Sequence, residues 1–211
     1  MTRGLVLCLT SLLLTACGGT GTLYVTARFS SDGSTPSSRA RVTVREAASY
    51  GGLVTDAQVS VTGSKMPKTG LPFAMMSNDY QASGFGWDES LRLEVVRGND
   101  RVEATVQSPG FTVITAPTQD GTVVKANGLL VTWRDAGNAP ANIVRLRLEQ
   151  ADVDVTLADD KFQHRIGADP LVVTDRESVY LERSNEIAPE GGAPGSVISA
   201  TTTHAIQFKV E

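Results

Sequence analysis

The stretch LYVTARF, residues 23–29, alternates apolar and polar side chains and places Leu23, Val25, Ala27 and Phe29 on one face of an extended chain. A period of two is the pattern of a β-strand that buries one face. The same alternation recurs in RARVTVRE, residues 39–46. No segment after residue 17 carries an apolar stripe of helical period over three turns. The sequence therefore predicts an all-β fold.

Further short segments with strand character are separated by turn-forming Gly, Pro, Asn and Asp residues. They are residues 56–63, 91–96, 101–106, 111–115, 128–133, 143–149, 153–157, 171–174, 178–182, 196–200 and 205–210. Arg97-Gly98-Asn99-Asp100 has the residues of a hairpin turn. About thirteen strands exceed the seven of a simple sandwich. We therefore predict two β-sandwich modules, residues 22–110 and 111–211, with one larger β-sandwich as the alternative.

Each half resembles a known kind of β-module. VTDAQVSVTG (54–63) and NDYQASGFGWDESLRLEV (78–95) resemble transthyretin-like modules of the carboxypeptidase-regulatory type. LLVTW (129–133), followed by IVRLRLE (143–149), resembles the second and third strands of a fibronectin type III or other immunoglobulin-like domain. The resemblance implies immunoglobulin-like sandwiches with Trp133 as a core residue. It departs from that pattern where Val144 or Leu146 stands in place of an aromatic residue.

The N-terminal residues have the three parts of a secretory signal: Arg3, an apolar run from Leu5 to Leu14, and the small residues Thr15 and Ala16. Leu14-Thr15-Ala16-Cys17 resembles the lipobox of bacterial lipoproteins. That resemblance implies that residues 1–16 are removed as a signal peptide and that Cys17 is lipidated. It also implies a cell-envelope protein, expected at the outer membrane because Gly18 follows the cysteine. A signal peptide without lipidation is the alternative.

Several classes of function are excluded if Cys17 starts the mature chain. Cys8 leaves with the signal peptide, so neither disulfides nor thiol chemistry are expected. Removing Arg3 from 19 basic residues leaves 18 against 23 acidic ones, a net charge of −5, which argues against nucleic acid as a partner. Residues 17–21 form a short tether that extends at most ~3.5 Å per residue, about 17 Å in all. The folded part is therefore expected close to the membrane.

No motif for catalysis or for a cofactor is present. His164 and His204 lie far apart in the sequence and lack the spacing of a zinc site. The nucleophile motif Gly-x-Ser-x-Gly is also absent from the sequence. We predict that the protein is not an enzyme and has no catalytic, cofactor-binding or metal-binding residues.

The acidic group Asp152, Asp154, Asp159 and Asp160 is the best candidate for a calcium site, although it lacks the loop pattern of known calcium motifs. Alternation offers a simpler interpretation, in which Asp152 and Asp154 face solvent. If Gln150-Ala151 is the turn, Arg147 lies opposite Asp154, a favourable cross-strand pair. A turn two residues longer would place Glu149 there instead. We prefer the first register.

Residues 72–90 concentrate apolar and aromatic side chains in a turn-rich stretch: Phe73, Met75, Met76, Tyr80, Phe85 and Trp87. Aromatic residues and Met are enriched in interface cores. Tyr80, Phe85 and Trp87 are therefore a candidate partner surface, and the alternative is that they close one end of the first sandwich.

Together these features predict a non-enzymatic, membrane-anchored lipoprotein. We expect it to be a protein-docking or structural module of the bacterial cell envelope, with an envelope or surface protein as its partner. An adhesive or glycan-binding surface module is the alternative.

Overall fold

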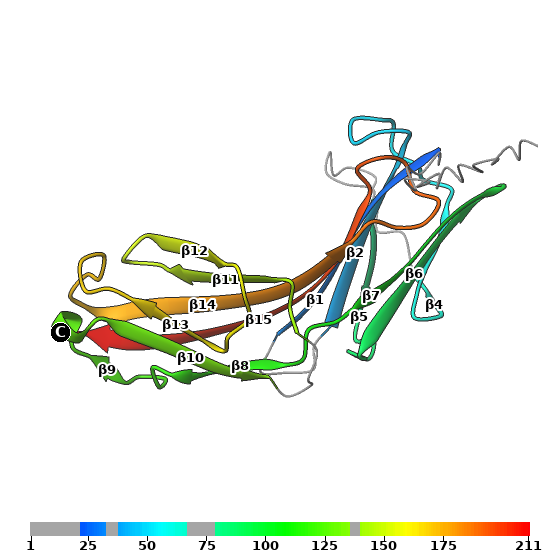
Figure 1. The fold of residues 1–211 in the computed structure, drawn as a ribbon. Coiled ribbons are helices and arrows are strands. Elements are labelled where there is room, and N and C mark those ends of the chain that lie inside the picture. The colour runs from blue at the N-terminus through cyan, green and yellow to red at the C-terminus, as the bar shows by residue number, and fades with distance from the viewer. Residues whose placement is uncertain (1–21, 33–37, 67–78, 136–139) are drawn as a thin grey trace, which may run out of the picture.

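A computed structural model describes residues 22–32, 38–66, 79–135 and 140–211. These residues form fifteen β-strands and one 3₁₀ helix, η1 (Lys125–Asn127), so the prediction of an all-β fold is confirmed (Figure 1). The strands are β1 (Leu23–Asp32), β2 (Ser38–Glu46), β3 (Gln58–Val61), β4 (Ser64–Lys65), β5 (Tyr80–Ser83), β6 (Ser90–Arg97), β7 (Asp100–Gln107), β8 (Thr112–Ala116), β9 (Thr122–Val123), β10 (Leu129–Asp135), β11 (Ile143–Leu148), β12 (Val153–Leu157), β13 (Gln163–Ile166), β14 (Thr174–Ile187) and β15 (Val197–Val210).

An eight-stranded sheet runs the length of the molecule in the order β12-β11-β14-β15-β1-β2-β5, with β9 also paired to β15. Its centre is the antiparallel pair of long strands β14 and β15 (Figure 1). The first strand, β1, pairs in parallel with β15, from Thr26 opposite Val197 to Asp32 opposite Thr203. The N-terminal and C-terminal parts of the chain are therefore joined in one sheet.

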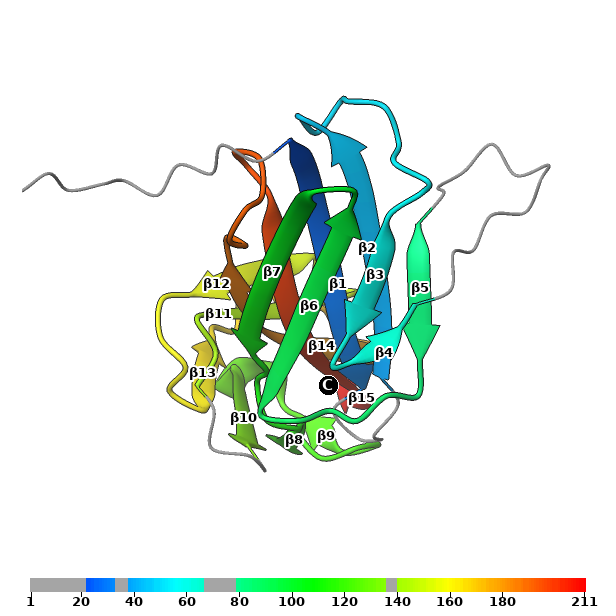
Figure 2. The ribbon, with the colours of Figure 1, turned by 90° about the vertical axis from the view of Figure 1, so that its right-hand side faces the viewer.

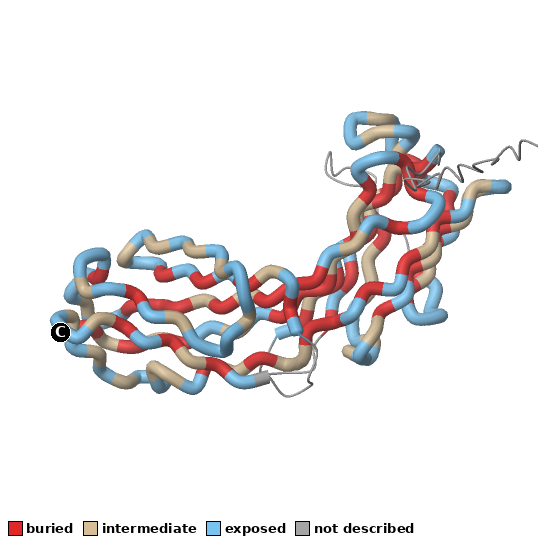
Figure 3. Tube along the Cα trace, viewed as in Figure 1, coloured by how far each residue is buried: buried red, intermediate tan, exposed pale blue. Residues whose placement is uncertain are grey.

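Two smaller sheets cover different parts of this shared sheet. The four-stranded sheet β4-β3-β6-β7 lies over the β1–β2 end, as Figure 2 shows, and the three-stranded sheet β13-β10-β8 belongs to the other half. One core contains Phe29 and Leu93, and a separate core contains Trp133 and Leu181. Figure 3 shows buried segments in both halves of the molecule. The protein is thus built from two β-sandwiches, as predicted, and Trp133 is a core residue, as the resemblance implied.

The two sandwiches share strands, which the sequence did not indicate. Ile198 and Ala200 of β15 belong to the first core, whereas Ile206 and Phe208 of the same strand belong to the second. The predicted segments 196–200 and 205–210 are therefore one continuous strand. The domain boundary between residues 110 and 111 stays a prediction, but part of the range 111–211 completes the first core.

Local pairings agree with several expectations. Arg97 lies opposite Asp100, so β6 and β7 form the predicted hairpin, and Gly98 takes the positive φ of 59° that such a turn requires. Arg147 lies opposite Asp154, which is the preferred register of β11 and β12. Residues 171–173 were predicted as strand, but β14 begins only at Thr174. The strands β4, β5, β9 and β13 had not been predicted.

A buried polar junction lies between the two cores. Arg183 of β14 is fully buried, and its Nη1 donates to Thr112 Oγ1 at 2.9 Å. Its Nε donates to Asp160 Oδ2 at 2.8 Å. The arginine thereby connects β14 with the chain that passes from one sandwich to the other.

Asn185 makes a second set of contacts at this junction. Its Nδ2 donates to the carbonyl oxygens of Gln107, at 3.0 Å, and Pro140, at 3.1 Å. Its Oδ1 accepts from the backbone N–H of Asn142 at 2.7 Å. Satisfied buried polar groups fix a packing arrangement, because moving them apart would leave them without partners. The junction therefore holds the two sandwiches in one relative orientation.

Candidate functional site

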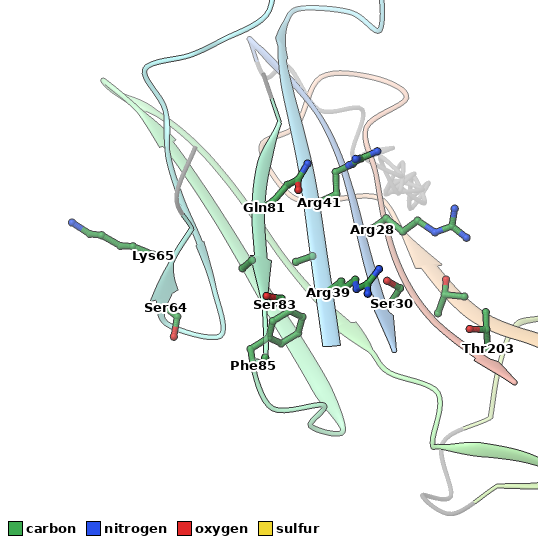
Figure 4. A pocket seen from close by; sticks show the side chains of 14 residues that line it. Arg28, Ser30, Arg39, Arg41, Ser64, Lys65, Gln81, Ser83, Phe85 and Thr203 are labelled. Carbon is green, nitrogen blue, oxygen red and sulfur yellow. The ribbon is translucent and has the colours of Figure 1, made fainter. Parts of the chain in front are cut away.

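Arginines gather on the outward face of the shared sheet. Arg39 and Arg41 flank the buried Ala40 on β2 and so point away from the first core. Arg28 of β1 lies directly opposite Arg41, and Ser30 lies opposite Arg39. Figure 4 shows Arg28, Arg39 and Arg41 on the same side of the sheet, while Lys65 points away from them.

The same face continues into the second sandwich. In the β-ladder, Arg145 of β11 lies opposite Glu182, Glu182 lies opposite Thr203, and Thr203 lies opposite Asp32 of β1. Because residues opposite each other in a sheet point to the same side, Arg145 shares a side with Asp32 and hence with Arg28. We call this surface the arginine face; its arginines are Arg28, Arg39, Arg41, Arg145 and Arg147.

Two adjoining hollows lie along this face. The larger, of about 1070 Å³, is lined by Arg28, Arg39, Arg41 and Gln81 among others (Figure 4). The smaller, of about 510 Å³, is lined by Arg145, Arg147, Asp154, Tyr180 and Glu182 among others. Thr203 lines both hollows. A partner seated over β15 would therefore reach arginines of both sandwiches.

Three of the five arginines have carboxylate partners. Arg28 Nη2 lies 3.7 Å from Glu182 Oε1, and Arg41 Nε lies 3.4 Å from Asp79 Oδ2. Arg145 Nε donates to Asp154 Oδ1 at 2.7 Å, and this hydrogen bond holds the pKa of the Asp154 carboxyl below its ordinary value. The ion pair of Asp154 is thus with Arg145, diagonally across the ladder, although Arg147 is its register partner.

The two remaining arginines have no ion pair with any residue that the structure describes. Arg39 is one of them. Arg147 is the other, and its guanidinium lies 4.5 Å from the centre of the Tyr180 ring, a cation–π contact. Arginine presents a planar fork of donors that matches a carboxylate, and a stacked guanidinium is already oriented. Arg39 and Arg147 are therefore available to bind carboxylates of a partner.

The predicted aromatic surface is not an exposed patch. Tyr80 is a buried core residue with 3% of its surface exposed. Phe85 and Trp87 are half-buried and pack on the same core, with the Phe85 ring edge-on to Phe29 at 6.3 Å. The alternative interpretation, closure of one end of the first sandwich, fits these positions. Phe73, Met75 and Met76 lie outside the described residues, as does Cys17.

Three of the four acidic residues considered for calcium have separate basic partners. Asp154 binds Arg145, Asp159 lies 3.2 Å from Lys161, and Asp160 binds the buried Arg183. Within the described parts of the chain, no three His, Cys, Asp or Glu residues come close enough to hold a metal ion. His164 lies on β13, in the three-stranded sheet, whereas His204 lies on β15 and accepts a hydrogen bond from the backbone of Ile114.

Sequence reasoning identified Arg145 and Arg147 as outward-facing but did not find the arginine face. Alternation in RARVTVRE also marks Arg39 and Arg41 as outward. The sequence does not reveal that β1 pairs in parallel with β15. That pairing brings Arg39 and Arg41 into the same sheet as Arg145 and Arg147.

Comparison with known proteins gives no family for this chain: no protein-family model and no curated protein matches it. Among solved structures, the tandem Ig repeats of Dlar align with 90% of this chain and 100% of that chain, at 15% identity and a TM-score of 0.29. A likeness at that score supports no conclusion about function. In the described residues, no helix is long and apolar enough to cross a membrane.

Proposed function

We propose that this protein is a non-enzymatic, lipid-anchored docking module of the bacterial cell envelope. In this proposal residues 1–16 are removed, Cys17 carries the lipid at the outer membrane, and the arginine face binds an acidic surface of an envelope protein. The observation that carries the proposal is the gathering of five arginines on one sheet face of a chain whose net charge is −4. Arg39 and Arg147 supply the cations that have no ion pair among the described residues.

Support for a docking role also comes from the way the two sandwiches are joined. The strands β14 and β15 run through both, and Arg183 and Asn185 fix the junction with buried hydrogen bonds. A face that is already rigid loses little conformational entropy when a partner binds. The arginine face therefore suits a protein surface of matching length better than a small ligand.

A non-enzymatic role is supported by where the titratable residues lie. His204 is engaged by a backbone N–H, and the acidic residues of the 152–160 region are held by basic side chains or separated from one another. The larger hollow of the arginine face is lined mainly by arginine, serine and threonine. The smaller hollow also contains His204 and carboxylates, but Asp154 and Glu182 are paired there with Arg145 and Arg28.

The glycan-binding alternative is less well supported. Glycan recognition by stacking needs solvent-exposed aromatic rings, and the candidate residues Tyr80, Phe85 and Trp87 contribute to the first core instead. Tyr180 stands on the arginine face, but the Arg147 guanidinium lies over its ring.

The test is crosslinking and affinity capture of the full chain, expressed in a bacterium, from solubilised membranes. Arg39→Glu/Arg147→Glu is compared with the wild type and with Arg134→Glu/Arg165→Glu, which reverses two exposed arginines on β10 and β13. We expect one stoichiometric partner to be captured by the wild type and the control but not by the face variant. Equal capture by all three would remove the arginine face as the docking surface.

The anchor is tested separately by metabolic labelling with a radioactive fatty acid. We expect label in the wild type and none in Cys17→Ser, which should be released into the soluble fraction. Labelling that is independent of Cys17 would overturn the anchor. Binding to a glycan array with no protein partner would favour the adhesive alternative.

A further inference from the structure

One end of the first sandwich carries a loop beside the start of β1. The backbone N–H of Ala47 donates to the carbonyl oxygen of Thr22 at 2.8 Å, and Leu23 lies opposite Glu46 in the ladder. The loop that follows β2 is therefore adjacent to the first described residue of the chain. Figures 1 and 2 both show it, in light blue, beyond the end of β2 and next to the start of β1.

This loop presents the most exposed large apolar side chain of the described residues. Tyr50 is 89% exposed, and Leu53, in the same loop, is 36% exposed. The loop is held by hydrogen bonds from Gly51 N to Ala48 O and from Glu46 N to Gly52 O, both 2.9 Å. Arg45 Nη1 also donates to Gly51 O at 3.0 Å. Tyr50 thus projects from an ordered loop.

A single exposed aromatic residue needs no explanation by itself. The proposed tether, however, would place this one close to the membrane. Only residues 17–21 separate the proposed lipid on Cys17 from Thr22. At ~3.5 Å per residue they reach about 17 Å, which keeps the Thr22 end of the body beside the bilayer. The 14-residue strand β15 begins with Val197 opposite Thr26 of β1 and ends at Val210. Val210 therefore marks the end of the shared sheet that is farther from the tether.

The charged residues around the loop do not favour anionic lipid. Arg97 Nη1 lies 3.2 Å from Glu46 Oε1, and Arg97 Nε lies 2.9 Å from Asp56 Oδ1. Asp100 accepts a hydrogen bond from the hydroxyl of Thr22. A cluster of basic residues that would attract anionic lipid is therefore absent from this described surface.

We propose that this end of the first sandwich rests on the bilayer, with Tyr50 and Leu53 in the headgroup region. The inference rests on the proposed lipid anchor and adds an orientation to it. Tyrosine suits the interface because its ring is apolar and its hydroxyl remains hydrated. Without a basic cluster, the contact depends on apolar burial, so neutral lipid is sufficient and salt has little effect. The second sandwich then points away from the membrane.

The orientation is tested with single cysteines, since the lipidated mature chain would contain no other free thiol. Full-length Tyr50→Cys and its control Val173→Cys are expressed in a bacterium, purified from membranes and labelled with an environment-sensitive fluorophore. Val173 is 64% exposed and lies just before β14, near Val210. Each protein is then reconstituted into phosphatidylcholine vesicles that contain a lipid-borne quencher.

We expect several-fold stronger quenching at position 50 than at position 173, unchanged in high salt. Equal quenching of the two labels in protein that remains membrane-bound would overturn the orientation alone. Recovery of the expressed protein from the soluble fraction would overturn the lipid anchor and the orientation together. Quenching that disappears in high salt would contradict the apolar contact and indicate electrostatic attraction.

Discussion

The guanidinium of Arg183 and the carboxylate of Asp160 form a buried ion pair between the two sandwiches, with 2.8 Å between Nε and Oδ2. The exposed fractions of the two side chains are 0% and 4%. Asp160 Oδ1 also accepts from Trp133 Nε1 at 3.1 Å. The pair therefore connects the second core with the chain at Thr112, and it accounts for one of the aspartates that the sequence offered to calcium.

Removing the charge of Asp160 should strongly destabilise the protein. In Asp160→Asn the buried Arg183 guanidinium loses the charge of this carboxylate, and breaking one partner of a buried ion pair costs about 3–5 kcal/mol. Urea denaturation measures the change in the free energy of unfolding. Asp159→Asn is the matched control, because Asp159 and Lys161 are exposed, and its effect should stay below about 1 kcal/mol. Equal effects of the two variants would contradict a structural role for the buried pair.

His204 should make the protein less stable in mild acid. Burial lowers the pKa of His204 below its ordinary value of 6.5, and its Nδ1 accepts a hydrogen bond from Ile114 N. The unfolded chain then takes up the proton more readily than the folded one, so stability falls as the pH drops through the unfolded pKa and levels off below the folded pKa.

The measurement is Tm between about pH 7.5 and about pH 5.5, a range in which histidine is the main side chain to titrate. We expect Tm of the wild type to fall across this range and the fall to be smaller in His204→Asn. His164→Gln serves as the control and should behave like the wild type. A wild-type Tm that rises toward acid would show that the assigned direction is wrong.

Gly191 should tolerate no side chain. It has φ of +73°, and a Cβ there would lie 2.2 Å from the carbonyl oxygen of Arg101. Gly63 has φ of +81° but open space around it, so Gly63→Ala should cost only the left-handed backbone conformation, ~1–2 kcal/mol. Gly191→Ala should cost more, because the Glu190–Glu103 bridge beside it must also shift. Chemical denaturation compares the two, and similar losses would contradict the close approach.

Local alternation was sufficient to predict most strands and the β6–β7 hairpin. It also placed Arg147 opposite Asp154, since the apolar positions of 143–149 and 153–157 and a short turn leave few registers. It did not predict β5, because Tyr80 was interpreted as part of an aromatic cluster in a turn-rich stretch. Nor did it join 196–200 with 205–210, where the polar run Thr201-Thr202-Thr203-His204 interrupts the pattern.

That interruption has a structural cause. Thr202 is fully buried at the junction, where its hydroxyl lies 3.4 Å from that of Thr112. β15 leaves the first core and enters the second at this point, so its buried position is polar rather than apolar. The arginine face was missed for a related reason, because it depends on the long-range pairing of β1 with β15, and no local pattern specifies which distant strands become neighbours.

The shared strand predicts that residues 22–110 will not fold by themselves. Without β15, the first core loses Ile198 and Ala200, and β1 becomes an unpaired edge along Thr26–Asp32. A ¹H–¹⁵N correlation spectrum of the 22–110 fragment should show the narrow dispersion of an unfolded chain, whereas residues 22–211 should give a dispersed spectrum. Appending residues 196–203 through a long flexible linker should restore dispersion, because it returns the missing strand. A well-dispersed spectrum from the fragment alone would mean that residue 110 ends an independent domain and that β15 is not needed to complete it.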